Sequence, residues 1–320
     1  MQPPSSGSIL CNNHFENDFH MIKKLQQALS HVLLGKEEVI RMGITCLLAN
    51  GHLLLEDIPG MGKTTFSHAL AQLTGMQYRR IQFTSDLLPS DLLGVSIFDS
   101  QLKSFYFHRG PIFSQLILAD EINRATPKTQ SALLEAMEER QVTSDGGTEH
   151  LPKPFFVIAT ENPSYHAGTY PLPESQLDRF LMRLSIGYPP PDAERTLLKS
   201  PEFNSKVSEL KPIINPDQLM DLQLQSQKVI VSDLVLDYVQ ALLAASRNQG
   251  WFDHGLSPRA GIGLIRAAQA YAKTDDRSFI RPDDIQAVMP AIVNHRLVIR
   301  KSTTQLSAAE LLMNGVEVPV

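Results

Sequence analysis

The sequence predicts an α/β domain, in which a parallel sheet lies between helices, followed by a smaller all-helical domain. Three observations predict this. Short apolar runs alternate with segments of helical periodicity as far as the proline-rich stretch Tyr188–Pro191. Two of these runs, Gln115–Ala119 and Phe155–Thr160, have no alternation of polar residues, which is typical of strands buried on both faces of a parallel sheet. Beyond Pro191 only helical patterns occur.

Five apolar runs are expected to form the sheet, namely His52–Glu56, Tyr78–Phe83, Gln115–Ala119, Phe155–Thr160 and Met182–Ile186. Helical spacing at 19–34 and 37–49 precedes them. Residues 84–110 are less regular, and either a hairpin or a short inserted helix fits them. Residues 141–151 predict a second hairpin that turns at Asp145-Gly146. In the second domain, Ser232, Ser257 and Pro282 are expected to begin helices.

Composition limits the possible functions. The chain has 320 residues, a net charge of −5 and no basic stripe, which argues against a dedicated nucleic-acid protein. Cys11 and Cys46 have no partner at metal-ligand spacing, so reduced thiols in a cytoplasmic protein are expected. No apolar run reaches the length of about 18 residues that a membrane span needs. The polar start of the chain lacks the basic region of a signal peptide, and residues 1–18 are expected to form a disordered tail.

The stretch between His52 and Leu73 has the order that a phosphate-binding loop requires: an apolar run, a Gly/Pro loop and a helix. In such a loop, backbone N–H groups and the positive end of the helix point at one spot. The residues expected to bind nucleotide here are Pro59, Gly60, Met61, Gly62, Lys63, Thr64 and Thr65. Lys63 can reach the β- and γ-phosphates of a nucleotide, and the Thr64 hydroxyl can hold Mg²⁺. The first position of the pattern, usually glycine, is Asp57.

Polar side chains also end the next two central strands. Asp120 and Glu121 follow one of them, and Asn162 follows the other. Ligands of open α/β sheets bind at the carboxyl ends of the strands, so these residues are expected near the phosphate loop. Asp120 can bind Mg²⁺, Glu121 can deprotonate a water that attacks the γ-phosphate, and Asn162 can hold that water or the γ-phosphate.

Asp120-Glu121 and Asn162, in this order after the loop, resemble the Walker B and sensor 1 motifs of AAA+ ATPases. Four longer stretches resemble one branch of these proteins, the MoxR ATPases: Leu55–Thr64, Gln82–Gly94, Ala119–Ala125 and Leu172–Phe180. The resemblance runs from about Leu33 to Leu297. It implies an AAA+ core with a five-stranded parallel sheet at 19–191 and a linker with a helical lid at 192–320.

The resemblance also assigns residues outside the loop. Arg179 matches the arginine finger that reaches the γ-phosphate of a neighbouring subunit, with Arg183 as the alternative. Arg259, at the start of a lid helix, matches sensor 2, which touches the nucleotide when the lid packs across the site. Gly35 belongs to a segment similar to the adenine-side segment of the family. Residues 94–107 and 141–151 correspond to the helix-2 insert and the pre-sensor-1 hairpin.

The function that the resemblance implies is ATP hydrolysis, with ATP and Mg²⁺ as cofactors, by a hexameric ring that forms with ATP. Such a ring would act as a chaperone or maturation motor on a client protein complex, with a partner that carries a von Willebrand factor A domain. Two alternatives are a motor subunit for DNA remodelling or metal chelation and a nucleotide switch that does not hydrolyse. The acidic balance argues against DNA, and the presence of Glu121 and Asn162 argues against the switch.

Overall fold

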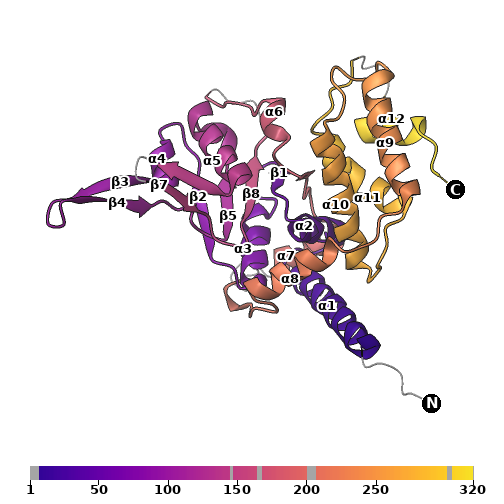
Figure 1. The fold of residues 1–320 in the computed structure, drawn as a ribbon, viewed down its shortest axis with the longest axis horizontal. Coiled ribbons are helices and arrows are strands. Elements are labelled where there is room, and N and C mark those ends of the chain that lie inside the picture. Colours follow the sequence, from indigo (N-terminus) through magenta and orange to yellow (C-terminus); the bar gives the residue numbers. More distant parts are fainter. Residues whose placement is uncertain (1–6, 145–146, 164–167, 200–206, 301–304, 320) are drawn as a thin grey trace.

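The computed structural model describes residues 7–144, 147–163, 168–199, 207–300 and 305–319. Its centre is a five-stranded sheet in the order β2-β5-β8-β1-β9 (Figure 1). The strands are β1 (Leu53–Glu56), β2 (Tyr78–Gln82), β5 (Leu116–Asp120), β8 (Phe156–Glu161) and β9 (Met182–Leu184). Every neighbouring pair is parallel, so the carboxyl ends of all five strands lie along one edge. The five-stranded parallel sheet expected from the sequence is confirmed.

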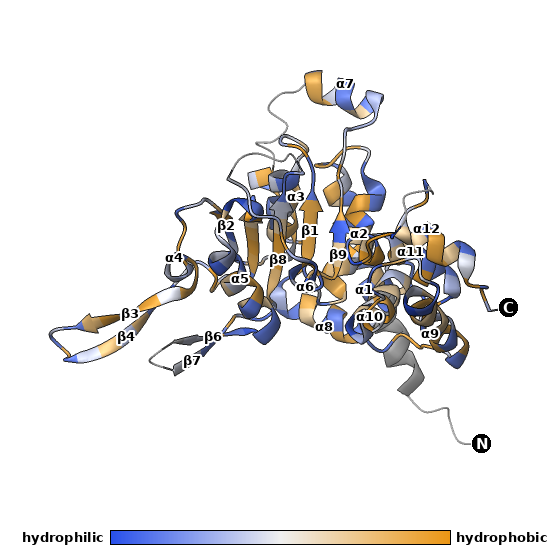
Figure 2. Cartoon of the chain, turned by 90° about the horizontal axis from the view of Figure 1, so that it is seen from above, coloured by the Kyte–Doolittle hydropathy of each residue, from blue (hydrophilic) through white to orange (hydrophobic). Residues whose placement is uncertain are grey.

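Both faces of this sheet are buried, because successive side chains of a strand point to opposite sides. Leu53 and Leu55 of β1 belong to one hydrophobic cluster and Leu54 to another. The first cluster includes side chains of α1 (Gly7–Ser30), α2 (Glu37–Leu48) and α3 (Lys63–Thr74). The second includes side chains of α4 (Pro89–Leu93) and α5 (Pro127–Glu139), with the 3₁₀ turn Ile122–Arg124 beside them. Figure 2 shows the resulting hydrophobic colouring of β1 and β8.

Two hairpins stand out from this core. One pairs β3 (Gly94–Asp99) with β4 (Ser104–Arg109) and extends away from the sheet (Figure 1). Residues 84–110 therefore contain both expected alternatives, the helix α4 and a hairpin. The other pairs β6 (Gln141–Ser144) with β7 (Gly147–His150), and its expected turn at Asp145-Gly146 lies outside the described residues.

The rest of the chain is helical, as expected. The helices are α6 (Glu174–Leu177), α7 (Pro191–Lys199), α8 (Pro216–Ser226), α9 (Asp233–Asn248), α10 (Pro258–Thr274), α11 (Pro282–Val293) and α12 (Ala308–Gly315). The side chains of Ser232 and Ser257 cap α9 and α10, as the sequence predicts. Helix α10 packs on α2, and α11 packs on β9. Within the described part of the chain, every helix is too short or too polar to cross a bilayer.

Helix α1 begins at Gly7 rather than at Phe19, within the segment expected to be a disordered tail. Residues 1–6 lie outside the described residues. Two features explain the longer helix. Between Ser8 and Ser30 the sequence has no glycine or proline that would end it. The helix is also held by tertiary contact, since the buried Nζ of Lys273 lies 3.2 Å from the Asp18 carboxylate.

Candidate functional site

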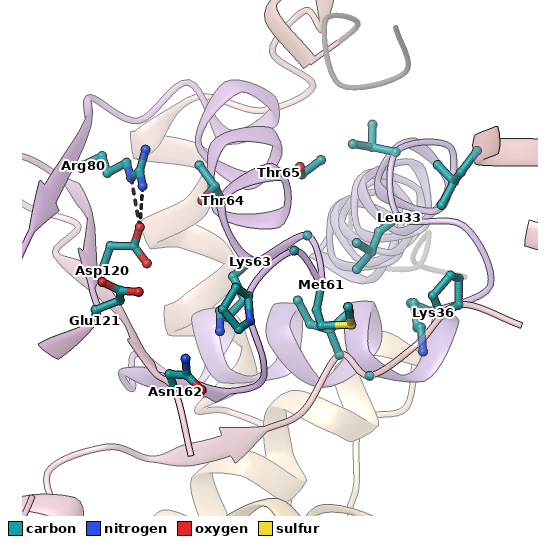
Figure 3. Close-up of a pocket in the computed structure, with 18 of the residues that line it drawn as sticks. Leu33, Lys36, Met61, Lys63, Thr64, Thr65, Arg80, Asp120, Glu121 and Asn162 are labelled. Atoms are coloured by element: carbon teal, nitrogen blue, oxygen red, sulfur yellow. Dashed lines mark hydrogen bonds and ion pairs between the residues drawn. The ribbon is translucent and has the colours of Figure 1, made fainter. Parts of the chain in front are cut away.

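A cavity of about 770 Å³ lies at the carboxyl edge of the sheet. It brings together most of the residues that the sequence predicts to bind nucleotide and metal. Its lining includes Pro59, Gly60, Met61, Gly62, Lys63, Thr64, Thr65, Asp120, Glu121 and Asn162. Figure 3 shows Asp120 and Glu121 along one side of this cavity, with Lys63 and Thr64 facing them.

Two glycines shape the loop that enters this cavity. Gly60 and Gly62 have φ angles of 88° and 91°, a conformation that side chains with a Cβ rarely adopt. A Cβ at Gly60 would meet nothing within 4 Å, so the backbone conformation rather than space requires glycine there. Helix α3 begins at Lys63 directly after this turn, which directs its positive end at the cavity. The loop therefore fits a bound phosphate chain.

Lys63 is folded back onto this loop. Its Nζ donates hydrogen bonds to the carbonyl oxygens of Asp57 at 2.5 Å and of Ile58 at 3.4 Å. Partial burial lowers the pKa of Lys63, while the negative charges of Asp57, Asp120 and Glu121 oppose that shift. The same ammonium can turn from these carbonyl groups to the oxygens of a phosphate.

The two acids at the end of β5 are held differently. The buried Asp120 accepts a hydrogen bond at Oδ1 from the hydroxyl of Thr160, at 2.6 Å. Glu121 has a φ of 57°, unusual for a residue with a Cβ, and its backbone N–H donates to the same hydroxyl at 2.8 Å. Thr160, on the neighbouring strand, thus fixes the turn that separates the two carboxylates. Backbone strain of this kind is typical of functional sites.

Sequence reasoning missed three polar partners of these acids. Arg80 donates from Nη2 to Oδ2 of Asp120 at 2.6 Å, and Gln82 donates to Glu121 at 2.9 Å. Arg124 also lies 3.1 Å from the Glu121 carboxylate. A signal was present for two of them: Arg80 and Gln82 are two residues apart on β2, which pairs with β5. Side chains at that spacing share one face of a strand.

Asp57 has a structural role that explains its departure from the phosphate-loop pattern. Its buried carboxylate accepts hydrogen bonds from the Ser185 hydroxyl at 3.0 Å, from the backbone N–H of Ile186, and from that of Gly187 at 3.2 Å. It therefore ties the start of the loop to the segment that follows β9. Ile186 and Gly187 themselves line the cavity.

Of the other predicted site residues, Asn162 lines the cavity and Gly35 does not. Asn162 lines it, and its backbone carbonyl accepts from Asn123 at 3.2 Å. Gly35 is not among the lining residues, although Val32–Leu34 are. It has a φ of 69°, and a Cβ there would lie 2.4 Å from Pro190. Gly35 thus permits close packing of the segment after β9, and the residues around it form that wall.

The residues present fit a magnesium–nucleotide complex. Among the described residues, no group of three or more His, Cys, Asp or Glu side chains could hold a metal. Mg²⁺ does not need such a cage, because it is usually bound by one or two protein oxygens together with phosphate oxygens and water. Asp120 and the Thr64 hydroxyl line the same cavity as the phosphate loop and are suited to be those protein oxygens.

A second cavity, of about 540 Å³, contains the predicted arginine finger. Its lining includes residues 49–52, which precede β1, and Arg140, which follows α5. Arg179 is 29% exposed and lies 3.1 Å from Glu138, whereas the neighbouring Asp178 pairs with Arg296 at 2.7 Å. The first cavity, called the nucleotide cavity below, lies at the carboxyl end of β1, and the second cavity lies at its amino end. The length of this strand, roughly 3.3 Å per residue, separates them.

Arg259, expected to touch the nucleotide when the lid packs across the site, does not line the first cavity in this structure. Arg259 lines the second cavity, where its Nη1 lies 2.7 Å from the Glu138 carboxylate beside Arg179. The reason is the position of the lid, which packs on α2 and β9 and places the start of α10 near the amino end of β1. The alternative finger, Arg183, is held within its own subunit by Glu56 at 2.9 Å and by the Asn294 carbonyl at 3.3 Å.

A phosphate loop, two acids at the next strand end and a helical lid on a five-stranded parallel sheet define the class of protein as an AAA-type ATPase. Comparisons with known proteins agree. Residues 52–182 match the ATPase family associated with various cellular activities (AAA), and residues 244–312 match the AAA lid domain.

More specific relatives name the branch. Chaperone MoxR1 of Mycobacterium tuberculosis is 37% identical over 88% of this chain and 77% of its own length. YeaC of Bacillus subtilis is 43% identical over 96% of this chain and 98% of its own. The chain belongs to the MoxR family of AAA+ ATPases. A crystal structure of a candidate ATPase from Cytophaga hutchinsonii superposes with a TM-score of 0.86, at 33% identity, over 97% of this chain and 98% of that one.

Proposed function

We propose that this ATPase works as a Mg²⁺-dependent motor that remodels or assembles partner protein complexes. The observation that carries the proposal is the convergence of Lys63, Thr64, Asp120, Glu121 and Asn162 on one cavity at the carboxyl edge of the sheet. These are the groups that phosphoryl transfer to water needs: a phosphate cradle, a metal ligand, a base and a group that positions water.

Each residue has a role that follows from its position. Lys63 leaves the carbonyl oxygens of the loop and binds the β- and γ-phosphates. Thr64 and Asp120 hold the metal, which when bound neutralises charge on the phosphate oxygens. Glu121 takes the proton of the attacking water, and Asn162 orients that water or the γ-phosphate. A complete set of these groups supports hydrolysis rather than a passive nucleotide switch.

The active site is completed by a second copy of the chain. Arg179 and Arg259 are partly exposed and lie together at the amino end of β1, away from the nucleotide of their own subunit. In a ring, that surface of one subunit meets the nucleotide cavity of the next, so both guanidinium groups reach a phosphate across the interface. Glu138, which pairs with both, holds them in place until then. We expect a hexameric ring that forms with ATP.

The proposed biological role is based on the names of related proteins and on the family resemblance. One relative is named a chaperone, and the family resemblance implies a partner with a von Willebrand factor A domain and a client complex in the cytoplasm. The two hairpins, β3–β4 and β6–β7, extend from the core and are the segments suited to contact a client. Nucleic acid is not expected as a partner, since the net charge is −5.

The test is phosphate release by the purified chain with Mg²⁺ and with EDTA. Wild type should release phosphate only with Mg²⁺. Glu121→Gln should bind ATP and lose roughly 10²- to 10⁴-fold in turnover, as expected for a lost general base. Light scattering should show this variant as a stable ring with ATP. Glu317→Gln, at an exposed acid after α12, is the matched control. Full turnover of Glu121→Gln would mean that another group activates the water.

A further inference from the structure

Arg80 lies on the nucleotide cavity and binds the acid assigned to the metal. Its Nε and Nη2 both donate to Oδ2 of Asp120, at 3.1 and 2.6 Å (Figure 3). Nη2 also donates to Gln82 at 3.1 Å. Gln82 in turn donates to Glu121 at 2.9 Å. A single chain of polar contacts on one face of β2 therefore reaches both Asp120, which ends β5, and Glu121, which follows it.

The two partners in this ion pair differ in mobility. The Asp120 side chain is 11% exposed, and the Thr160 hydroxyl holds it by a hydrogen bond to Oδ1. The Arg80 side chain is 50% exposed, so water can solvate its guanidinium when it leaves Asp120. Both hydrogen bonds from Arg80 go to Oδ2 of Asp120. A cation that binds Oδ2 would therefore compete with Arg80 for this atom. Arg80 is thus the member of the pair that can exchange its partner.

The position of Arg80 determines which new partner it can take. Arg80 lies beside Asp120, and Gln82 lies beside Glu121, the residue proposed to activate the attacking water. Water attacks the terminal phosphorus of ATP, so this side of the cavity faces the γ-phosphate. A guanidinium binds phosphate oxygens strongly, through charge-assisted and often bidentate hydrogen bonds. ADP would offer no phosphate at that place.

We propose that Arg80 is a second phosphate-binding cation of this site, which holds Asp120 in the empty chain and moves to the γ-phosphate of ATP. The proposal rests on the function proposed above and deepens it, because it makes Arg80 the residue that distinguishes ATP from ADP. Release of Asp120 would leave its Oδ2 free to bind Mg²⁺.

The experiment is a binding titration that does not depend on turnover. A fluorescent nucleotide bound to the full chain is displaced by ADP or by the non-hydrolysable analogue β,γ-imido-ATP, both with Mg²⁺. Arg80→Ala should lose roughly 10- to 100-fold in affinity for the ATP analogue, the size expected for charge-assisted hydrogen bonds, and change less than about threefold for ADP. Arg80→Lys should retain part of the preference, because it keeps the charge.

The matched control is Arg79→Ala. Arg79 is the exposed neighbour of Arg80 on β2, points to the opposite face of the strand and lies outside the lining of the cavity. Its loss should change neither affinity. A melting curve of Arg80→Ala that overlays wild type shows that the strand is intact, and the unchanged ADP affinity gives the same information at the site.

The outcomes separate the two proposals. Equal losses for ADP and the ATP analogue would make Arg80 a residue that only positions Asp120, and no loss for either would make it a surface ion pair. Either result overturns this inference while the proposed ATPase mechanism stands. A wild-type chain that binds neither nucleotide overturns both. Loss confined to the ATP analogue, with Arg79→Ala unchanged, supports the assignment.

Discussion

The two cavities at the ends of β1 differ in how they are built and in their charge. The nucleotide cavity takes most of its lining from a few short stretches, 59–65, 120–124 and 186–189 among them. The second cavity is lined by Arg140, Arg179, Arg259, Arg266 and Arg296, which come from separate parts of the chain, against only two acids, Glu138 and Asp178. The first cavity has the residues proposed to bind a phosphate chain and Mg²⁺, and the second has an excess of positive charge.

This contrast supports the proposal that the site is divided between subunits. In the first cavity, cations and acids already pair within hydrogen-bond distance, as for Arg80 with Asp120. In the second, Glu138 is shared by Arg179 and Arg259, so the arginines exceed the acids that can neutralise them. An anion from outside the chain would complete this charge balance. The proposed ring supplies that anion as the nucleotide of the next subunit.

The largest effect should come from removing the proposed finger. Arg179→Ala should lower turnover by roughly 10³- to 10⁵-fold, the range known for arginine fingers, and leave ATP affinity within about threefold. Steady-state phosphate release and nucleotide titration measure the two quantities. Glu138→Gln is the control, since it breaks the same ion pair but keeps the finger. It should cost far less, because a partly exposed pair is worth about 1 kcal/mol at most.

Mixing sharpens the same prediction. Lys63→Ala removes the phosphate-binding ammonium of the first cavity, and Arg179→Ala removes the finger of the second. Each variant alone should be inactive, while mixed rings contain interfaces with an intact lysine and an intact arginine. Some activity should therefore return at intermediate ratios. If mixed rings form but no ratio restores activity, the site is not shared between subunits.

The next effect tests the connection between the phosphate loop and the segment after β9. Asp57→Gly restores the usual loop pattern, yet it should destabilise the chain by about 3 kcal/mol. The reason is that the backbone N–H groups of Ile186 and Gly187 lose their buried acceptor. Urea unfolding measures the change. Asp57→Asn keeps one carbonyl oxygen and should cost less; an Asp57→Gly chain as stable as wild type would show that these bonds are dispensable.

The smallest effect concerns Glu161, at the end of β8 beside β1. Burial and the nearby charge of Glu56 raise the pKa of Glu161 from 4.5 to about 6. The folded chain therefore binds more protons than the unfolded chain between these pH values, so stability falls as the pH rises through this window. Glu161→Gln removes that penalty. It should stabilise the fold by roughly 1–2 kcal/mol above pH 6 and by nothing below about pH 4.5.

Unfolding at pH 4.5 and pH 7.5 checks this prediction. Glu174→Gln is a suitable control, because Glu174 begins the short helix α6 at an exposed position. It should show little difference between the two pH values. If Glu161→Gln were equally stabilising at both, the effect would come from packing rather than from ionisation.

The sequence by itself determined the nucleotide cavity in outline. Lys63 and Thr64 follow a glycine loop, and Asp120 and Glu121 end an apolar strand, so local order and the parallel sheet suffice to bring them to one edge. The same reasoning gave the five strands. It did not place the start of α1, where one of the contacts of the helix, from Lys273 to Asp18, joins residues far apart in the sequence.

Only the tertiary structure decided the partners of the charged groups. Asp57 meets Ser185 and Gly187, and Arg259 meets Glu138, over separations of more than a hundred residues. Periodicity predicts which face of an element a side chain occupies, but not which distant element packs against that face. The packing of the lid on α2 and β9 places Arg259 at the second cavity rather than the first, and the segment after β9 supplies the partners of Asp57.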